Sequence, residues 1–124
     1  MDTMTGCRSL MTVSDDLLFR SRVDAVVEHV EQKVAVCRRV EDLPPGSVVV
    51  LDCNRDVAGR IAFIAQLQQD HAPDLVTLAV CSHVDAATRA TMKRAGVSVI
   101  CTNGSMQRVL ARELTREEHD AAST

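Results

Sequence analysis

The stretch SVVVLDCNRD, residues 47–56, brings a run of aliphatic side chains directly up to a carboxylate. Residues 48–51 are all aliphatic, and Asp52 follows them without any apolar–polar alternation. Strands that alternate bury one face, whereas strands without alternation are typical of parallel sheets that helices cover on both sides. Residues 47–51 are therefore predicted to form a central parallel strand with Asp52 at its carboxyl end.

The rest of the chain alternates between strand and helix patterns. Apolar residues recur at spacings of three and four between Phe19 and Val30, which predicts an amphipathic helix. Pro44, Pro45 and Gly46 break any helix before the central strand, so the second helix should be short or absent. The predicted strands are residues 9–13, 33–36, 47–51, 75–80 and 97–101. The other predicted helices are residues 57–69, residues 84–95 with Gly96 at the end, and a segment from Met106 that Ser105 can cap.

This alternation predicts an α/β fold in which helices cover both faces of a parallel sheet. With right-handed crossovers, five strands give a flavodoxin-like (βα)5 doubly wound sandwich of strand order 2-1-3-4-5. The 124 residues suffice for one domain with a sizeable core. We expect a flexible N-terminus at residues 1–8, the domain at residues 9–115 and a polar C-terminal tail at residues 116–124.

The composition narrows the classes of function. With no Trp or Tyr and two Phe, an aromatic platform for single-stranded nucleic acid is nearly excluded. A net charge of −3 without a Lys/Arg block argues against nucleic-acid and membrane partners. No signal peptide or membrane-spanning run is evident, so a cytoplasmic protein is expected. The five cysteines form no CxxC pair, which disfavours a zinc site and predicts reduced thiols that pack as small hydrophobes.

Polar residues follow the predicted strands at the edge where ligands bind in such sheets. Asp15 and Asp16 come after the first strand, and Asp52 and Asn54 come at the end of the third. Three carboxylates this close cannot all ionise cheaply without a cation, and Mg²⁺ would take their oxygens. The plainer alternative is that these aspartates only cap helices or end strands.

In these residues the chain resembles the receiver domains of two-component response regulators, over about residues 9–115. The family's acidic pair matches Asp15 and Asp16 in VSDDLLFRSRV, and its phospho-accepting aspartate matches Asp52 in VVVLDCN. The resemblance implies a Mg²⁺ ion bound by these three residues and by the backbone carbonyl of Asn54. It also implies a protein partner, either a sensor histidine kinase or a downstream effector, and possible pairing of two copies. Such a domain is no enzyme beyond its own phosphorylation and dephosphorylation.

Other positions depart from the family. The Thr or Ser that ends the fourth strand corresponds to Ser82, or to Cys81 when counted back from Gly96. Where the family has Lys followed by Pro after the fifth strand, this chain has Asn103 and Gly104. Asn cannot supply the ammonium that pairs with a phosphoryl group. No aromatic residue stands at the family's switch position on the fifth strand. These departures indicate a degenerate, or pseudo-, receiver.

Three functions follow from these observations. The first is a stand-alone receiver-like signalling module that binds a partner protein, with weak or lost phosphorylation of Asp52. The second is a working Mg²⁺-dependent, phospho-accepting single-domain regulator. The third, a small enzyme or nucleotide-binding protein, is disfavoured because SDDLLF stands where a glycine-rich loop would follow the first strand.

Overall fold

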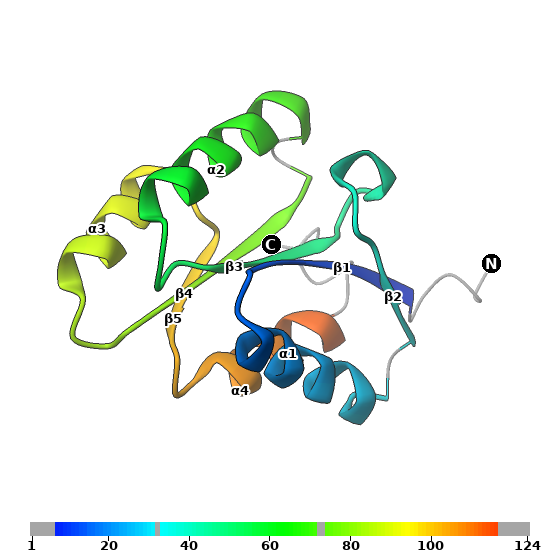
Figure 1. Ribbon diagram of the computed structural model, residues 1–124. Helices are drawn as coiled ribbons and strands as arrows, with labels where there is room; N and C mark the ends of the chain where they lie inside the picture. Colours follow the sequence, from blue (N-terminus) through cyan, green and yellow to red (C-terminus); the bar gives the residue numbers. More distant parts are fainter. Residues whose placement is uncertain (1–6, 32, 72–73, 117–124) are drawn as a thin grey trace.

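The protein forms one parallel sheet with helices on both faces (Figure 1). The computed structural model describes residues 7–31, 33–71 and 74–116. The strands are β1 (Cys7–Val13), β2 (Lys33–Val36), β3 (Val48–Asp52), β4 (Val76–Cys81) and β5 (Val99–Thr102). The helices are α1 (Leu17–His29), α2 (Val57–His71), α3 (Ala86–Arg94) and α4 (Met106–Thr115), with a 3₁₀ turn, η2 (Val40–Asp42). The order β2-β1-β3-β4-β5 confirms the predicted fold class.

The central strand has the burial that its sequence predicts. All five residues of β3 are buried. Val48 and Val50 belong to the core under α1 and α4, whereas Val49 and Leu51 belong to the core under α2 and α3. Figure 1 shows these two pairs of helices on opposite faces of the sheet. A strand packed on both sides has no solvent face to alternate toward, and this explains its unbroken aliphatic run.

The element ends also follow the local sequence. The connector with Pro44 and Pro45 forms only the three-residue turn η2, so the second helix is absent as predicted. Gly96 has a φ of 92° just after α3, a conformation that favours glycine at a helix end. Ser105 takes the N-cap position of α4, but its hydroxyl bonds back to Thr102 rather than to the helix.

The predicted ends of the domain differ slightly from the structure. β1 begins at Cys7, two residues before the predicted strand, and α4 ends at Thr115. The expected flexible N-terminus, apart from Cys7 and Arg8, and the expected tail after Arg116 lie outside the described residues. None of the helices in the described part of the chain is long and apolar enough to cross a membrane.

Candidate functional site

The end of β1 and the end of β3 meet at a buried hydrogen bond. The two strands pair in parallel, with Val13 opposite Leu51, and this register places Ser14 beside Asp52. The Ser14 hydroxyl donates to Oδ2 of Asp52 at 2.6 Å. Both side chains are buried, and Asp52 is 3% exposed. The hydroxyl thus satisfies one oxygen of a carboxylate that is shielded from water.

Asn54 and Asn103 extend this contact toward the surface. The backbone N–H and the side-chain amide of Asn54 donate to Oδ1 of Asp52 at 3.2 and 2.8 Å. The amides of Asn54 and Asn103 then bond each other in both directions, at 2.9 and 3.0 Å. We call these four residues, Ser14, Asp52, Asn54 and Asn103, the polar chain. It links the ends of β1, β3 and β5, and both oxygens of Asp52 accept hydrogen bonds within it.

Three arginines fix the backbone around the polar chain. Arg60 from α2 donates to the carbonyl of Asp52 at 2.8 Å. From α1, Arg20 and Arg22 donate to the carbonyls of Ser14 and Asn103, at 2.7 and 3.2 Å. Within the described residues no Lys or Arg forms an ion pair with the Asp52 carboxylate. Its charge is therefore balanced by neutral donors, while the guanidinium groups hold the loops.

Solved structures share this arrangement of strands and helices, although no family model and no curated protein matches the chain. A CheY-like protein, TadZ, from Pseudomonas aeruginosa aligns with a TM-score of 0.66 at 15% identity, over 86% of this chain and 98% of its own. A response regulator receiver protein from Burkholderia phymatum gives 0.62 at 16% identity, over 86% and 94%. This chain has the CheY-like receiver fold. The predicted resemblance is confirmed at the level of the fold.

A third solved structure with this receiver fold is of a protein whose name refers to pilus assembly. The putative pilus assembly-related protein from Burkholderia pseudomallei has a TM-score of 0.65 at 18% identity, over 88% of this chain and 90% of its own. The three alignments have identities well below those that carry function. They establish the architecture, and the residues at the strand ends have to be judged from this chain alone.

The acidic pair after β1 is used differently from the receiver pattern. Oδ1 of Asp16 accepts hydrogen bonds from the backbone N–H groups of Leu18 and Phe19, so Asp16 caps α1. Asp15 is exposed. Of the three carboxylates expected to meet, only Asp52 lies in the polar chain. In the described residues no three His, Cys, Asp or Glu side chains are placed to hold a metal ion. The described structure does not bring Asp15, Asp16 and Asp52 together as one group, and a Mg²⁺ site at these residues stays a prediction.

Ser82 was expected to hydrogen-bond a phosphoryl group. It lies directly after the end of β4. Its hydroxyl accepts from the backbone N–H of Val84 at 3.3 Å, and in the described structure it makes no hydrogen bond to Asp52. The cap of α3 is Asp85, whose carboxylate accepts from the N–H of Thr88 at 3.0 Å. Hydrogen bonds from Thr88 lower the pKa of Asp85. The alternative residue, Cys81, is the buried last residue of β4.

The cysteines near the strand ends are held as neutral thiols. Burial, with a smaller contribution from Cys81, raises the pKa of Cys53 to about 12. Burial also raises the pKa of Cys101 to about 11 and that of Cys81 above its usual value. A thiol with so high a pKa is a poor nucleophile at neutral pH. These three cysteines therefore pack as small hydrophobes, as the sequence predicts.

Ser14 is the site residue that the sequence interpretation missed. Its signal lies in the strand ends: Ser14 follows Val13 directly, as Asp52 follows Leu51, and neighbouring parallel strands place such positions side by side. The sequence prediction instead named the two aspartates that follow Ser14, Asp15 and Asp16.

Proposed function

We propose that the chain is a receiver-like signalling module that acts by binding a partner protein, and that phosphorylation of Asp52 is weak or lost. The observation that carries this proposal is that both oxygens of the Asp52 carboxylate accept hydrogen bonds from Ser14 and Asn54. A carboxylate must present a free oxygen to attack phosphorus. The hydrogen bonds that both oxygens accept in this buried site lower their reactivity toward phosphorus.

The residue at the end of β5 supports the same proposal. Asn103 stands where the resemblance expects Lys, and its amide pairs with Asn54 instead of offering a positive charge. Negative charge that develops on a transferring phosphoryl group is stabilised by fixed cations and donors. Without an ammonium group at this end of the sheet, transfer to Asp52 would proceed slowly.

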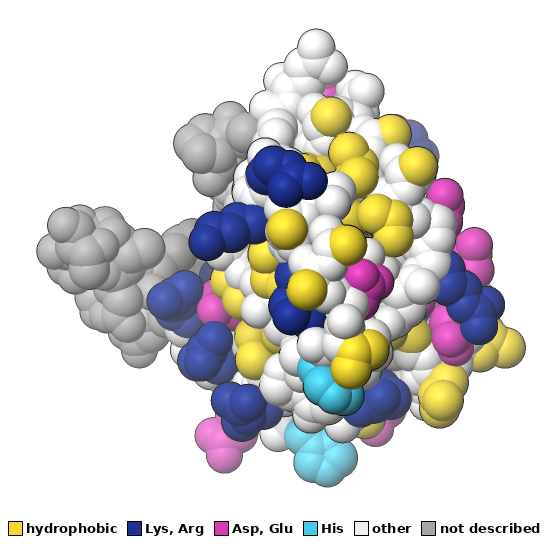
Figure 2. Space-filling view, turned by 90° about the vertical axis from the view of Figure 1, so that its left-hand side faces the viewer, with side chains coloured by type: hydrophobic (Ala, Val, Ile, Leu, Met, Phe, Trp, Pro, Cys, Tyr) yellow, Lys and Arg dark blue, Asp and Glu magenta, His cyan; other side chains and the backbone are white. Residues whose placement is uncertain are grey.

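Exposed apolar side chains near the strand ends support a role in protein binding. Leu17 and Leu18 begin α1 and are 82% and 69% exposed, and Val84 in the loop after β4 is 76% exposed. Figure 2 views this end of the molecule and shows hydrophobic side chains on it, with Lys and Arg along one border. These exposed apolar side chains are available for contact with a partner. The partner would be a sensor histidine kinase, a downstream effector or a second copy, in the cytoplasm.

The structural comparisons also support a proposal about the setting in which the chain binds its partner, which is pilus assembly. Two of the solved structures with this fold are named as pilus assembly proteins, from Burkholderia pseudomallei and Sinorhizobium meliloti. The latter aligns with a TM-score of 0.59 at 15% identity, over 87% of this chain and 99% of its own. A module in a protein assembly needs a specific surface and needs no phosphoryl switch. This setting agrees with an Asp52 that is held by neutral donors.

The alternative proposal is a working Mg²⁺-dependent, phospho-accepting module. It requires that Ser14 and Asn54 release Asp52, and that Asp15 or Asp16 turn toward it to share a cation. If Asp16 turns, loss of its cap on α1 would accompany metal binding. This rearrangement gives the alternative a distinct signature, because Mg²⁺ would have to change the start of α1.

Incubation with a small acyl phosphate, with and without Mg²⁺, distinguishes the two proposals. We expect intact-mass spectra to show no phosphoryl addition, and thermal melting to be unchanged by Mg²⁺. Asp52→Asn is the matched control for any labelling. Rapid stoichiometric labelling that this variant abolishes would contradict the main proposal and support the alternative.

A further inference from the structure

The crossover between β2 and β3 lacks the helix that the neighbouring crossovers carry. Because β1 lies between β2 and β3 in the sheet, this crossover passes over β1. It does so with the three residues of η2, whereas α1, α2 and α3 have 13, 15 and 9 residues. Figure 1 shows only this short turn above the β1–β2 side of the sheet.

The exposure of paired residues shows the effect of the missing helix. Met11 of β1 pairs with Val49 of β3, and Val13 pairs with Leu51, so each pair points to the same face. Under α2 and α3, Val49 and Leu51 are fully buried, whereas Met11 and Val13 are only half-buried. On the same face, Ser9 of β1 is buried, whereas its partner Ala35 on the edge strand β2 is exposed. This part of the sheet is therefore covered less completely than the part beside it.

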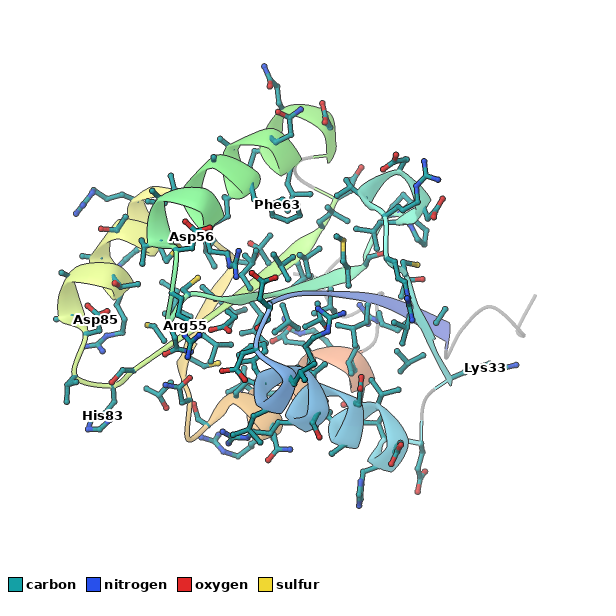
Figure 3. The ribbon with its side chains drawn as sticks, viewed as in Figure 1. Lys33, Arg55, Asp56, Phe63, His83 and Asp85 are labelled. Atoms are coloured by element: carbon teal, nitrogen blue, oxygen red, sulfur yellow. The ribbon has the colours of Figure 1, made fainter. Side chains whose placement is uncertain are left out.

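A groove of about 500 Å³ lies beside η2, between that turn and α2. The residues that line it are Val40, Glu41, Phe63, Gln66, Leu67 and Asp70. The four from α2 are spaced by three, one and three positions, so they form one face of the helix. Figure 3 shows Phe63 on the side of α2 that faces the turn. We call this surface the η2–α2 groove.

The charges at the η2–α2 groove have one predominant sign. Its lining contains two carboxylates, Glu41 and Asp70, and no Lys or Arg. Asp70 is exposed and accepts a hydrogen bond from Gln66 at 2.9 Å. Arg39 pairs with Glu41 at 2.9 Å and offsets part of the charge at that end, while Asp42 adds an exposed carboxylate there. An apolar floor with an acidic rim is complementary to an apolar stripe flanked by basic residues.

We propose that the η2–α2 groove binds an amphipathic helix of a partner protein, with its apolar stripe against Val40 and Phe63 and with Lys or Arg near Glu41 and Asp70. A helix docked in this way buries side chains at spacings of three and four in an apolar groove. It adds cover on the side of the sheet where the crossover supplies only a turn. The inference rests on the proposed role in partner binding, but it does not depend on the chemistry of Asp52.

The test uses two helix-stabilised peptides with the same leucine stripe, one flanked by Lys and the other by Glu. Backbone amide shifts of the full chain report where each peptide binds. We expect the Lys peptide to shift the amides of η2 and of α2 around Phe63, and to bind about tenfold more tightly than the Glu peptide. The double variant Gln66→Lys/Asp70→Lys, at two exposed positions, should reverse this preference. Asp24→Lys, on an exposed position of α1 on the other face, is the matched control and should not reverse it.

Three outcomes of the peptide experiment would overturn this inference. They are no shifts with either peptide, shifts centred on another face, and a preference that the double variant leaves unchanged. A dimer in sedimentation whose interface maps to the groove would also overturn it, in favour of a second copy as the occupant. Since labelling of Asp52 is measured separately, failure of the groove leaves the result on phosphorylation standing, and the converse also holds.

Discussion

The hydroxyl of Ser14 donates a 2.6 Å hydrogen bond to Oδ2 of Asp52 and so joins the end of β1 to the end of β3. At this position a neutral donor, and not a second carboxylate, faces the buried aspartate. A buried carboxylate that accepts hydrogen bonds from a hydroxyl and an amide has the donors that such a group needs. The bond therefore bears on both the stability of the domain and the chemistry of Asp52.

Ser14→Ala should lower the free energy of unfolding by about 1–3 kcal/mol, because it leaves a buried carboxylate oxygen without its donor. Urea denaturation measures the change. Ser21→Ala is the control, at an exposed position of α1 where the change should stay within about 0.5 kcal/mol. Equal effects of the two substitutions would show that the Ser14–Asp52 bond contributes nothing to stability.

Ser14→Asp should convert the polar chain into a cation site. Two carboxylates side by side repel each other, so we expect the variant to melt at a lower temperature than the wild type in the absence of divalent ions. Mg²⁺ should restore about 1 kcal/mol, a few degrees in melting temperature, because it takes oxygen ligands from both groups. The wild type should show no such response. A variant that ignores Mg²⁺ would contradict this reading of Ser14.

The amide pair of Asn54 and Asn103 can be measured by a double-mutant cycle. Each residue is substituted by Ala, singly and together. Either single substitution already breaks both hydrogen bonds, at 2.9 and 3.0 Å, so the double variant should lose about 1 kcal/mol less than the sum of the two single variants. Pairing Asn54→Ala with Thr115→Ala, at the far end of α4, provides a cycle in which additivity is expected. A coupling near zero in the first cycle would show that the pair does not link β3 to β5.

The fold was predictable because its strongest signals are local. The unbroken aliphatic run before Asp52 predicts burial on both faces, and Pro44 and Pro45 leave no room for a second helix. Gly96 is a further local signal, because the residue that ends α3 has a positive φ, which suits glycine. Each of these signals acts within a few residues of the feature that it predicts.

The site was less predictable because one residue of offset decides which side chains meet. The sequence places Asp52 and Asn103 correctly at strand ends, but it cannot show where β1 stops and α1 starts. In the structure the Ser14 hydroxyl contacts Asp52, and Asp16 caps α1.

The two aspartates after β1 should differ in their effects on stability. Asp16→Ala removes an N-cap that bonds two backbone N–H groups, and should cost about 1 kcal/mol in the free energy of unfolding. Asp15→Ala, at an exposed neighbouring position, should change it by less than about 0.5 kcal/mol. Chemical denaturation of both variants measures the contrast. A larger loss in Asp15→Ala would place that residue, and not Asp16, in the structure at the start of α1.

Stability at alkaline pH should depend on the buried thiol of Cys53. Its pKa is raised from 9.0 to about 12 in the folded protein, mainly by burial. The unfolded chain therefore releases this proton at a lower pH than the folded chain does. The contribution is complete below about pH 9 and is lost progressively as the pH rises from about 9 toward 12. Stability should thus fall over this range.

Denaturation midpoints at about pH 8 and about pH 10.5 measure this loss. Cys53→Ala should show a smaller fall than the wild type between the two values, because the titrating thiol is gone. Cys37→Ala is the control, since this thiol is only half-buried. The chain has no Tyr, and the other buried thiols, Cys81 and Cys101, are common to all three proteins, so their effect cancels in the comparison. Equal falls in all three proteins would show that the Cys53 thiol ionises as readily folded as unfolded.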